Sequence, residues 1–529
     1  MIDERDDWKP LFFALIIAGV GVRVVEMLLA GGTLIDDAYI TLRYARNLAL
    51  GRGMVYNTGE RVLGAPPLYV LITAGLWRIV SFCKGSESAI GYVVTLFNIV
   101  LTAGAAWLLG RQLRRSLGFL ACLPLLIFAL YLPFIDNATT GMETTLFVAV
   151  LLLSLHLLRA RRPAWASLCL GLAVLIRAEA LLWIAAVMAT EWRRGKRPWS
   201  AAMLLPLAGV GAAWAIFGFV YFGTPIPHNV VAKSGWNVGL WGREGLFAYA
   251  WQVLHDFTIV PQWGSSPLSR VVMAGEVLLM FGFGAWGLRT LWRERSADLA
   301  WGLFFAGYVI FFVAGRGALG PSWYVIPPGL AIVIVAVHGL RAFVRAGPPA
   351  QRPPPAAGSS WPILRTVLCG LLALLVLGGS FHAWNRLRRP YYGAMETGYG
   401  RTGRFLAGVE PTSRLLVNEI GYIGYLADRH VYDMAGIVTP EVLRLRKHAA
   451  GEIDVPELIR RFAPDYVVVT GPFKRDAVLE SVTGKAIEPY RLVLEARPCY
   501  TFLRAPDEPD PFNSFASISA RSTYCWTRL

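Results

Sequence analysis

The residues with the clearest chemical capacity are two adjacent aspartates, Asp36 and Asp37, which follow the first long apolar run of the chain. A carboxylate in a cavity near a membrane surface can act as a general base that removes a proton from an attacking hydroxyl group. Residues 38–50 can form a short amphipathic helix, and Asp37 is suited to be its N-cap. Capping accounts for one carboxylate and leaves the other without a structural role.

Cationic residues near these aspartates are suited to bind a phosphate group. Arginine binds phosphate in a bidentate manner, and Arg43 and Arg46 lie within the helix predicted over 38–50. Binding to lipid headgroups is the alternative for both. The segment YFGTPIPHNVVAKSG (221–235) adds a histidine and a lysine, and GRGALGPSWYVIPP (315–328) adds an arginine. The predicted phosphate ligands are Arg43, Arg46, Arg177, His228, Lys233 and Arg316.

Further polar residues are predicted to contact substrate. Glu143 opens a helix in TTGMETTLF (139–147), where the helix dipole alone also favours an acid. Arg177 and Glu179 interrupt an apolar stretch, and a mutual ion pair is the alternative for them. The predicted substrate contacts are Tyr39, Tyr44, Asn47, Glu143, Glu179, Asn229, Tyr324 and Glu419.

The segment 418–442 is rich in glycine and aromatic residues. Gly421 and Gly424 predict a turn or a close approach of the backbone to a neighbour. Glu419 and Asp433 could contact a saccharide. The alternative for the whole segment is a strand–turn–strand piece of a domain core.

The sequence requires no cofactor. Two carboxylates together with a phosphate could hold a hard divalent cation, but no Cys-x-x-Cys or His-x-x-x-His motif is present. Six cysteines in 529 residues exclude a disulfide-rich scaffold. Cys499 and Cys525 are predicted to form a disulfide in an oxidising compartment, with two unpaired buried thiols as the alternative.

The composition indicates that membrane helices are the elements that position these residues. Only 16% of the residues are charged, against roughly 25% in soluble domains, and the mean hydropathy is +0.48. An ordinary soluble enzyme, a disordered chain and a protein with a single anchor are therefore excluded. The net charge of +16 fits basic cytoplasmic loops better than nucleic-acid binding. The runs long enough to span are 11–30, 89–110, 117–135, 143–160, 201–222, 268–288, 298–315, 323–341 and 361–380.

Topology follows from the positions of the basic clusters. Lys and Arg concentrate in cytoplasmic loops, so a cytoplasmic N-terminus requires an even number of crossings before Arg111. The runs 11–30, a retained first span rather than a signal peptide, and 89–110 then cross. Residues 67–83 lie along the outer interface, within a long first outer loop (31–88).

Two short apolar pieces, 164–176 and 180–190, also have basic flanks. As helices they are about 20 and 17 Å long, shorter than the ~30 Å core of a bilayer. They predict a hairpin with Arg177 and Glu179 near its outer tip, and one long buried helix is the alternative. The count becomes about eleven spans, with the C-terminus outside the cytoplasm.

Two domains are predicted. Residues 1–383 form a membrane domain with a second large outer loop (223–267) and a Pro/Ala/Gly-rich cytoplasmic linker (342–360). Residues 384–529 form an extracytoplasmic α/β domain, because strand-like segments alternate there with helix-like ones. The strand-like segments are 413–417, 466–470 and 491–494, and the helix-like ones are 440–449 and 455–462.

With these motifs in order along the chain, the sequence resembles the GT-C membrane glycosyltransferases that use polyprenyl-phosphate sugars, and most of all the actinobacterial terminal arabinofuranosyltransferases. The residues that carry the resemblance are DDAYITLRYARNLALGRGMVYNTGERV (36–62), TTGMETTLF (139–147), LGLAVLIRAEALL (170–182), YFGTPIPHNVVAK (221–233) and NEIGYIGYLADRHVYDMAGIVTPEV (418–442). It departs from the family at Leu63–Pro67, where a Glu-Gly-Tyr-Thr-like stretch is usual, and at Ala178, where proline is common.

The resemblance implies a GT-C membrane domain with two juxtamembrane helices in the first outer loop, and a loop aspartate, Asp36 or Asp37, as catalytic base. The donor would be a polyprenyl-phosphate sugar (arabinofuranose, mannose or similar). The acceptor would be an envelope glycan, glycolipid or protein at the outer face of a bacterial plasma membrane, and transfer would invert the anomeric centre. A flippase or transporter of lipid-linked sugars is one alternative, although no inverted repeat is visible. A non-catalytic envelope assembly protein is another.

Overall fold

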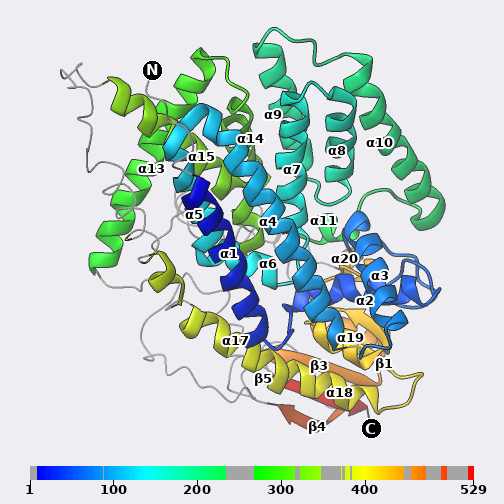
Figure 1. The fold of residues 1–529 in the computed structure, drawn as a ribbon. Coiled ribbons are helices and arrows are strands. Elements are labelled where there is room, and N and C mark those ends of the chain that lie inside the picture. The colour runs from blue at the N-terminus through cyan, green and yellow to red at the C-terminus, as the bar shows by residue number, and fades with distance from the viewer. Residues whose placement is uncertain are drawn as a thin grey trace.

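A computed structural model describes residues 9–86, 88–233, 267–315, 322–346, 371, 374, 376–381, 384–445, 454–471, 490–496 and 522–528. Its helices form a bundle, and a small C-terminal sheet lies at one end of this bundle (Figure 1). The helices before the sheet are α1 (Lys9–Leu29), α2 (Asp36–Ala49), α3 (Pro67–Phe82), α4 (Ala89–Leu117), α5 (Cys122–Leu130), α6 (Leu132–Thr139), α7 (Thr144–Arg159), α8 (Pro163–Val174), α9 (Ala180–Arg193), α10 (Ala201–Phe222), α11 (His228–Lys233), α13 (Pro267–Arg293), α14 (Leu299–Gly315) and α15 (Ser322–Ala346).

Several of these helices are long and apolar enough to cross a membrane. Within the described residues the candidates are Lys9–Leu29, Ala201–Phe222, Trp323–Arg345 and the stretch Ala89–Leu130, which contains α4, a 3-10 turn and α5. The number rises to as many as five if the bent pair Leu132–Thr139 and Thr144–Arg159 counts as one span. The chain is therefore a multi-pass membrane protein. The count of eleven spans and the orientation of the termini remain predictions.

The structure corrects the predicted span 117–135. Gly118–Ala121 is a 3-10 turn, and the chain breaks again between α5 and α6 at Tyr131, whose φ and ψ of −82° and 130° are extended. Pro133 lies in the first turn of α6, where a proline is tolerated at a helix start but not inside a helix. The segment is therefore three short pieces rather than one helix.

Two helices, α2 and α3, are present in the first loop. The 16 residues of α3 span about 24 Å, less than the ~30 Å bilayer core. Leu68 N–H in its first turn donates to the carbonyl of Leu175, which follows α8. The α8–α9 region is two short helices, and residues 175–179 connect them.

The C-terminal part begins with a helical stretch from Trp384 to Ala407, which contains α17 (Arg389–Ala394) and α18 (Arg401–Ala407) and π-helical turns at 384–388 and 395–400. A five-stranded sheet in the order β2-β1-β3-β5-β4 follows. Its strands are β1 (Arg414–Val417), β2 (His430–Asp433), β3 (Tyr466–Gly471), β4 (Tyr490–Ala496) and β5 (Ser522–Arg528).

Within the sheet, β1 pairs in parallel with β2 and β3, whereas β5 is antiparallel to β3 and β4. Short helices α19 (Tyr422–Ala427), α20 (Pro440–Arg444) and α21 (Val455–Phe462) join the strands. The segment 418–442 is thus not a strand–turn–strand piece, because α19 lies between β1 and β2.

One apolar core joins α2 and α3 to the C-terminal part, and it is separate from the large core of the helix bundle. It packs Tyr39 and Tyr44 of α2 against Tyr422 and Ile423 of α19. Accordingly, α2 lies between the helix bundle and the sheet in Figure 1. This shared apolar core therefore holds the first loop in contact with the C-terminal part.

Candidate functional site

Asp36 joins the first loop to the C-terminal part. Its carboxylate accepts the backbone N–H of Tyr422 at 2.7 Å and that of Gly421 at 3.0 Å, so it caps α19. Burial raises its pKa well above the usual range, Glu419 adds to the shift, and the two N–H donors oppose it. Both oxygens of Asp36 are therefore used to position the C-terminal part.

The glycine prediction of close approach is confirmed. A Cβ at Gly421 would lie 1.8 Å from the carbonyl oxygen of Asp36. One at Gly424 would lie 2.0 Å from the Tyr56 hydroxyl. A side chain at either position would push α19 away from the first loop.

Arg43 and Arg46 have partners in the C-terminal part, which corrects their assignment as phosphate ligands. The Arg43 guanidinium donates to the carbonyls of Gly424 (2.7 Å) and Arg429 (2.5 Å). Arg46 donates to the Tyr425 carbonyl at 3.0 Å and pairs with Asp428 at 2.7 Å. Their donors satisfy the carbonyls at the end of α19.

Three predicted substrate contacts of α2 are likewise structural. The Tyr39 ring stacks on Tyr422 with centroids 4.3 Å apart. The Tyr44 hydroxyl donates to the Val62 carbonyl and accepts the N–H of Gly64. The Asn47 amide donates to the carbonyls of Val55 and Tyr56. All three are buried, which explains their correction.

Asp37, in contrast, lines a cavity of about 60 Å³ between the helix bundle, the first loop and the C-terminal part. The remaining lining residues come from six separate segments: Ile40, Thr41, Gly64, Pro66, Met142, Glu143, Asn229, Trp323, Tyr324 and Ile437. Four predicted site residues thus meet here: Asp37, Glu143, Asn229 and Tyr324.

Glu143 reaches this cavity because the chain turns sharply before α7. Gly141 has a φ of +83°, a left-handed value that favours glycine, and α6 and α7 meet at a bend of 108°. The Tyr69 hydroxyl holds the turn by donating to the Gly141 carbonyl at 2.9 Å. Glu143 itself is the residue before α7, so it lies at the positive end of the helix dipole.

Arg177 fixes Glu143 from the α8–α9 connection. Its guanidinium donates to Glu143 at 2.9 Å and to Glu179 at 3.1 Å. It also lies 4.7 Å from the centre of the Tyr324 ring, in cation–π geometry. The ion-pair alternative for Arg177 and Glu179 is therefore correct. Two carboxylates neutralise this arginine, so its geometry supports positioning of Glu143 better than binding of phosphate.

The segment after α10 contributes α11. The backbone N–H of His228 donates to the Leu63 carbonyl at 2.6 Å, which places the next residue, Asn229, in the cavity lining. Burial lowers the pKa of His228. Lys233 ends α11, and its role stays a prediction.

Other predicted residues lie away from the cavity or outside the described part. Glu419 acts electrostatically on Asp36 and does not line the cavity. Asp433 accepts backbone N–H groups of Ala435 and Val438, so it does not face a saccharide. Arg316 and Cys499, most of the 223–267 loop and most of the 342–360 linker lie outside the described residues, so the disulfide with Cys525 stays a prediction.

Within the described residues, no group of three or more His, Cys, Asp or Glu side chains could hold a metal ion. These side chains therefore give no support to the divalent cation that the sequence allowed beside Asp36 and Asp37.

Sequence reasoning missed several apolar walls of the cavity, notably Trp323 and Ile437. Trp323 adjoins the predicted Tyr324, and Ile437 lies in the 418–442 segment, but both are large apolar side chains that also suit a core position. Gly64 also lines the cavity, in the stretch where the sequence departs from the family pattern.

The comparisons with known proteins agree with this architecture. The C-terminal residues 387–522 match a domain of unknown function, DUF8728. Two terminal beta-(1->2)-arabinofuranosyltransferases are similar in sequence. The one from Mycobacterium tuberculosis is 30% identical over 227 residues (39% of this chain, 36% of the relative). The one from Corynebacterium glutamicum is 26% identical over 260 residues (42% and 35%).

The match thus spans about a third of the length of these curated relatives. Among solved structures, ArnT from Cupriavidus metallidurans bound to undecaprenyl phosphate aligns over 98% of both chains, with a TM-score of 0.52 and 15% identity. This chain therefore has the GT-C membrane glycosyltransferase fold, and its sequence relatives lie in the actinobacterial terminal arabinofuranosyltransferase branch.

Proposed function

We propose that the chain is a membrane glycosyltransferase that moves a sugar from a polyprenyl-phosphate donor to an acceptor hydroxyl, with Asp37 as general base. The observation that carries the proposal is the cavity that collects Asp37, Glu143, Asn229 and Tyr324 beneath the membrane helices. Undecaprenyl phosphate bound to the ArnT structure supports a lipid-phosphate donor.

Asp37 is preferred to Asp36 because of their partners. Asp36 uses both oxygens to cap α19, whereas Asp37 faces the cavity. The acceptor hydroxyl loses its proton to Asp37 while its oxygen forms a bond to the anomeric carbon. The bond from that carbon to the phosphate oxygen breaks, and the lipid phosphate leaves with the electron pair. Attack from the opposite face inverts the anomeric centre.

The phosphate is assigned to the side of the cavity that α11 borders through Asn229. His228 and Lys233 of α11, together with Arg316, remain the proposed phosphate ligands. Glu143, held by Arg177, is proposed to orient a sugar hydroxyl. Arabinofuranose is the first donor sugar to test because of the two curated relatives.

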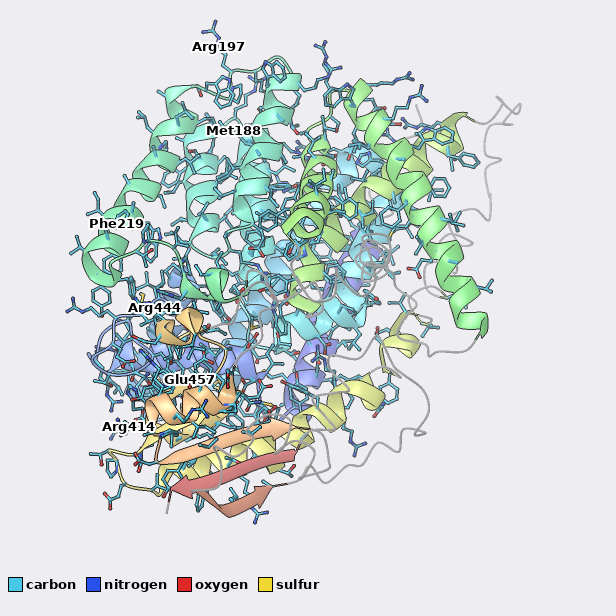
Figure 2. The ribbon with its side chains drawn as sticks, turned by 180° about the vertical axis from the view of Figure 1, so that it is seen from behind. Met188, Arg197, Phe219, Arg414, Arg444 and Glu457 are labelled. Carbon is cyan, nitrogen blue, oxygen red and sulfur yellow. The ribbon has the colours of Figure 1, made fainter. Side chains whose placement is uncertain are left out.

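The membrane placement is also a proposal: the N-terminus lies in the cytoplasm, and the cavity and residues 384–529 lie on the outer side. The basic clusters that support it include Arg197, which Figure 2 shows at the end of the bundle opposite Arg414, Arg444 and Glu457.

The test is sugar transfer by the purified protein in lipid nanodiscs from a panel of decaprenyl- and undecaprenyl-phosphate sugars. We expect one donor to be consumed with stoichiometric release of lipid phosphate and formation of an inverted glycoside. In a parallel assay with the protein in sealed lipid vesicles, donor that crosses the membrane unconsumed would instead support a transporter. Binding with neither transfer nor movement would support an assembly protein.

A further inference from the structure

A second cavity lies between α1 and α4, at the end of the bundle away from the C-terminal sheet (Figure 1). Its volume is about 510 Å³. Its cationic lining residues are Lys9, Arg111, Arg114 and Arg115, and none of its lining residues is acidic. The site proposed for sugar transfer does not use this cavity.

Close helix packing builds the wall of this cavity. A Cβ at Gly110 would lie 1.9 Å from the Phe12 ring, so α1 packs against α4 through a glycine. The guanidinium of Arg111 lies 5.1 Å from the centre of the Trp107 ring, in cation–π geometry. Arg111 therefore packs along the Trp107 ring while its side chain stays exposed at the cavity.

The same cavity has an apolar side. Phe13 and Trp107 line it and are 51% and 41% exposed, so both rings are available to an apolar chain. The 29 residues of α4 measure about 43 Å, against a ~30 Å bilayer core. If the aromatic rings face acyl chains, the arginines one to two turns further along α4 therefore reach the headgroup layer.

An amphipathic anion matches this arrangement of charge and exposed aromatic surface. We propose that the α1–α4 cavity binds an anionic phospholipid, with its headgroup phosphate among Arg111, Arg114 and Arg115 and an acyl chain along Phe13 and Trp107. Basic pockets between membrane helices bind lipid phosphates by the same charge complementarity. The proposal goes beyond sugar transfer and does not depend on it.

The test measures lipid retention by native mass spectrometry of the full chain, delipidated and then titrated with phosphatidylglycerol. The test variant is Arg111→Gln/Arg114→Gln/Arg115→Gln. The control is Arg161→Gln/Arg162→Gln/Arg197→Gln, which removes the same charge from exposed arginines outside the cavity lining. We expect the test variant to lose affinity about tenfold or more, whereas the control keeps the wild-type affinity.

Three further arms separate the sources of phosphate. Phosphatidylcholine should bind at least several-fold more weakly than phosphatidylglycerol, and millimolar inorganic phosphate should not displace the bound lipid. Deletion of residues 2–8, which are rich in aspartate and glutamate, should leave lipid affinity unchanged. Equal affinities of the two triple variants, displacement by inorganic phosphate, or binding only after the deletion would each overturn the proposal.

Discussion

Asp36 and Asp37 are neighbours in the chain but meet different partners. Asp36 accepts two backbone N–H groups of α19, while Asp37 lines the cavity. The sequence could locate the pair but could not separate their roles, because the partners of Asp36 lie 385 and 386 residues further along the chain. The same long-range contacts explain why Arg43 and Arg46 looked like phosphate ligands.

The close approach at Gly421 leads to the first prediction. Gly421→Ala should destabilise the protein by at least about 1–3 kcal/mol, because its Cβ would lie 1.8 Å from a backbone oxygen of α2. The control is Gly75→Ala in α3, because an added Cβ there would meet no neighbouring atom within 4 Å. Little change in stability or a slight gain is expected from this variant. Thermal unfolding of the purified variants measures both. Equal melting temperatures would show that α19 does not dock on α2 in this way.

At the scale of elements, the loop after β2 forms one wall of the cavity, and Ile437 is the residue of this loop that lines it. Asp433 holds it by accepting the N–H groups of Ala435 (2.7 Å) and Val438 (3.1 Å). Burial raises the pKa of Asp433 to about 6, although these N–H donors oppose the shift. Between about pH 4 and pH 6 the folded state therefore keeps a proton on Asp433 that the unfolded state has already lost.

This difference gives a prediction with a definite sign. Between about pH 4 and pH 6 the folded state binds more protons than the unfolded state, so stability falls as pH rises, by about 2–3 kcal/mol from this group. Thermal unfolding at pH 4.5 and 6.5 should show a larger loss in wild type than in Asp433→Asn. Identical pH dependence in the two proteins would contradict the assignment.

Element prediction from sequence succeeded where local pattern decides the structure. The segments around β1, β3, β4 and α21 were expected, because alternating or helical apolar patterns set them. It failed for 117–135, where hydropathy averages over the break at Tyr131. It also failed for α19, whose six residues depend on a cap from Asp36 that no local pattern encodes.

At the scale of the whole molecule, composition and basic clusters predicted a polytopic membrane protein with its chemistry on one side. Asp37 of α2, Glu143 before α7, Asn229 of α11 and Tyr324 of α15 line one cavity. Which sugar the cavity accepts could not be predicted, since its shape depends on apolar residues such as Trp323 and Ile437 from distant segments.

Cys83 allows the proposed orientation to be tested. It is a free, exposed cysteine at the end of α3, in the loop assigned to the outer face. A membrane-impermeant maleimide should label it in intact cells, with Cys83→Ser as background. Arg197→Cys in a Cys83→Ser protein should be labelled only after permeabilisation. Labelling of the Arg197 position in intact cells would reverse the topology.

The central claim is that Asp37 is the base for sugar transfer, and the most direct measurement is kcat for the donor that wild type consumes, in Asp37→Asn and Asp36→Asn. Loss of a general base should lower kcat by about 10² or more in Asp37→Asn. Asp36→Asn keeps an acceptor oxygen for α19, so its kcat should stay within about tenfold of wild type and its melting temperature should fall. Full activity in Asp37→Asn, or a collapse of kcat in Asp36→Asn alone, would contradict the account.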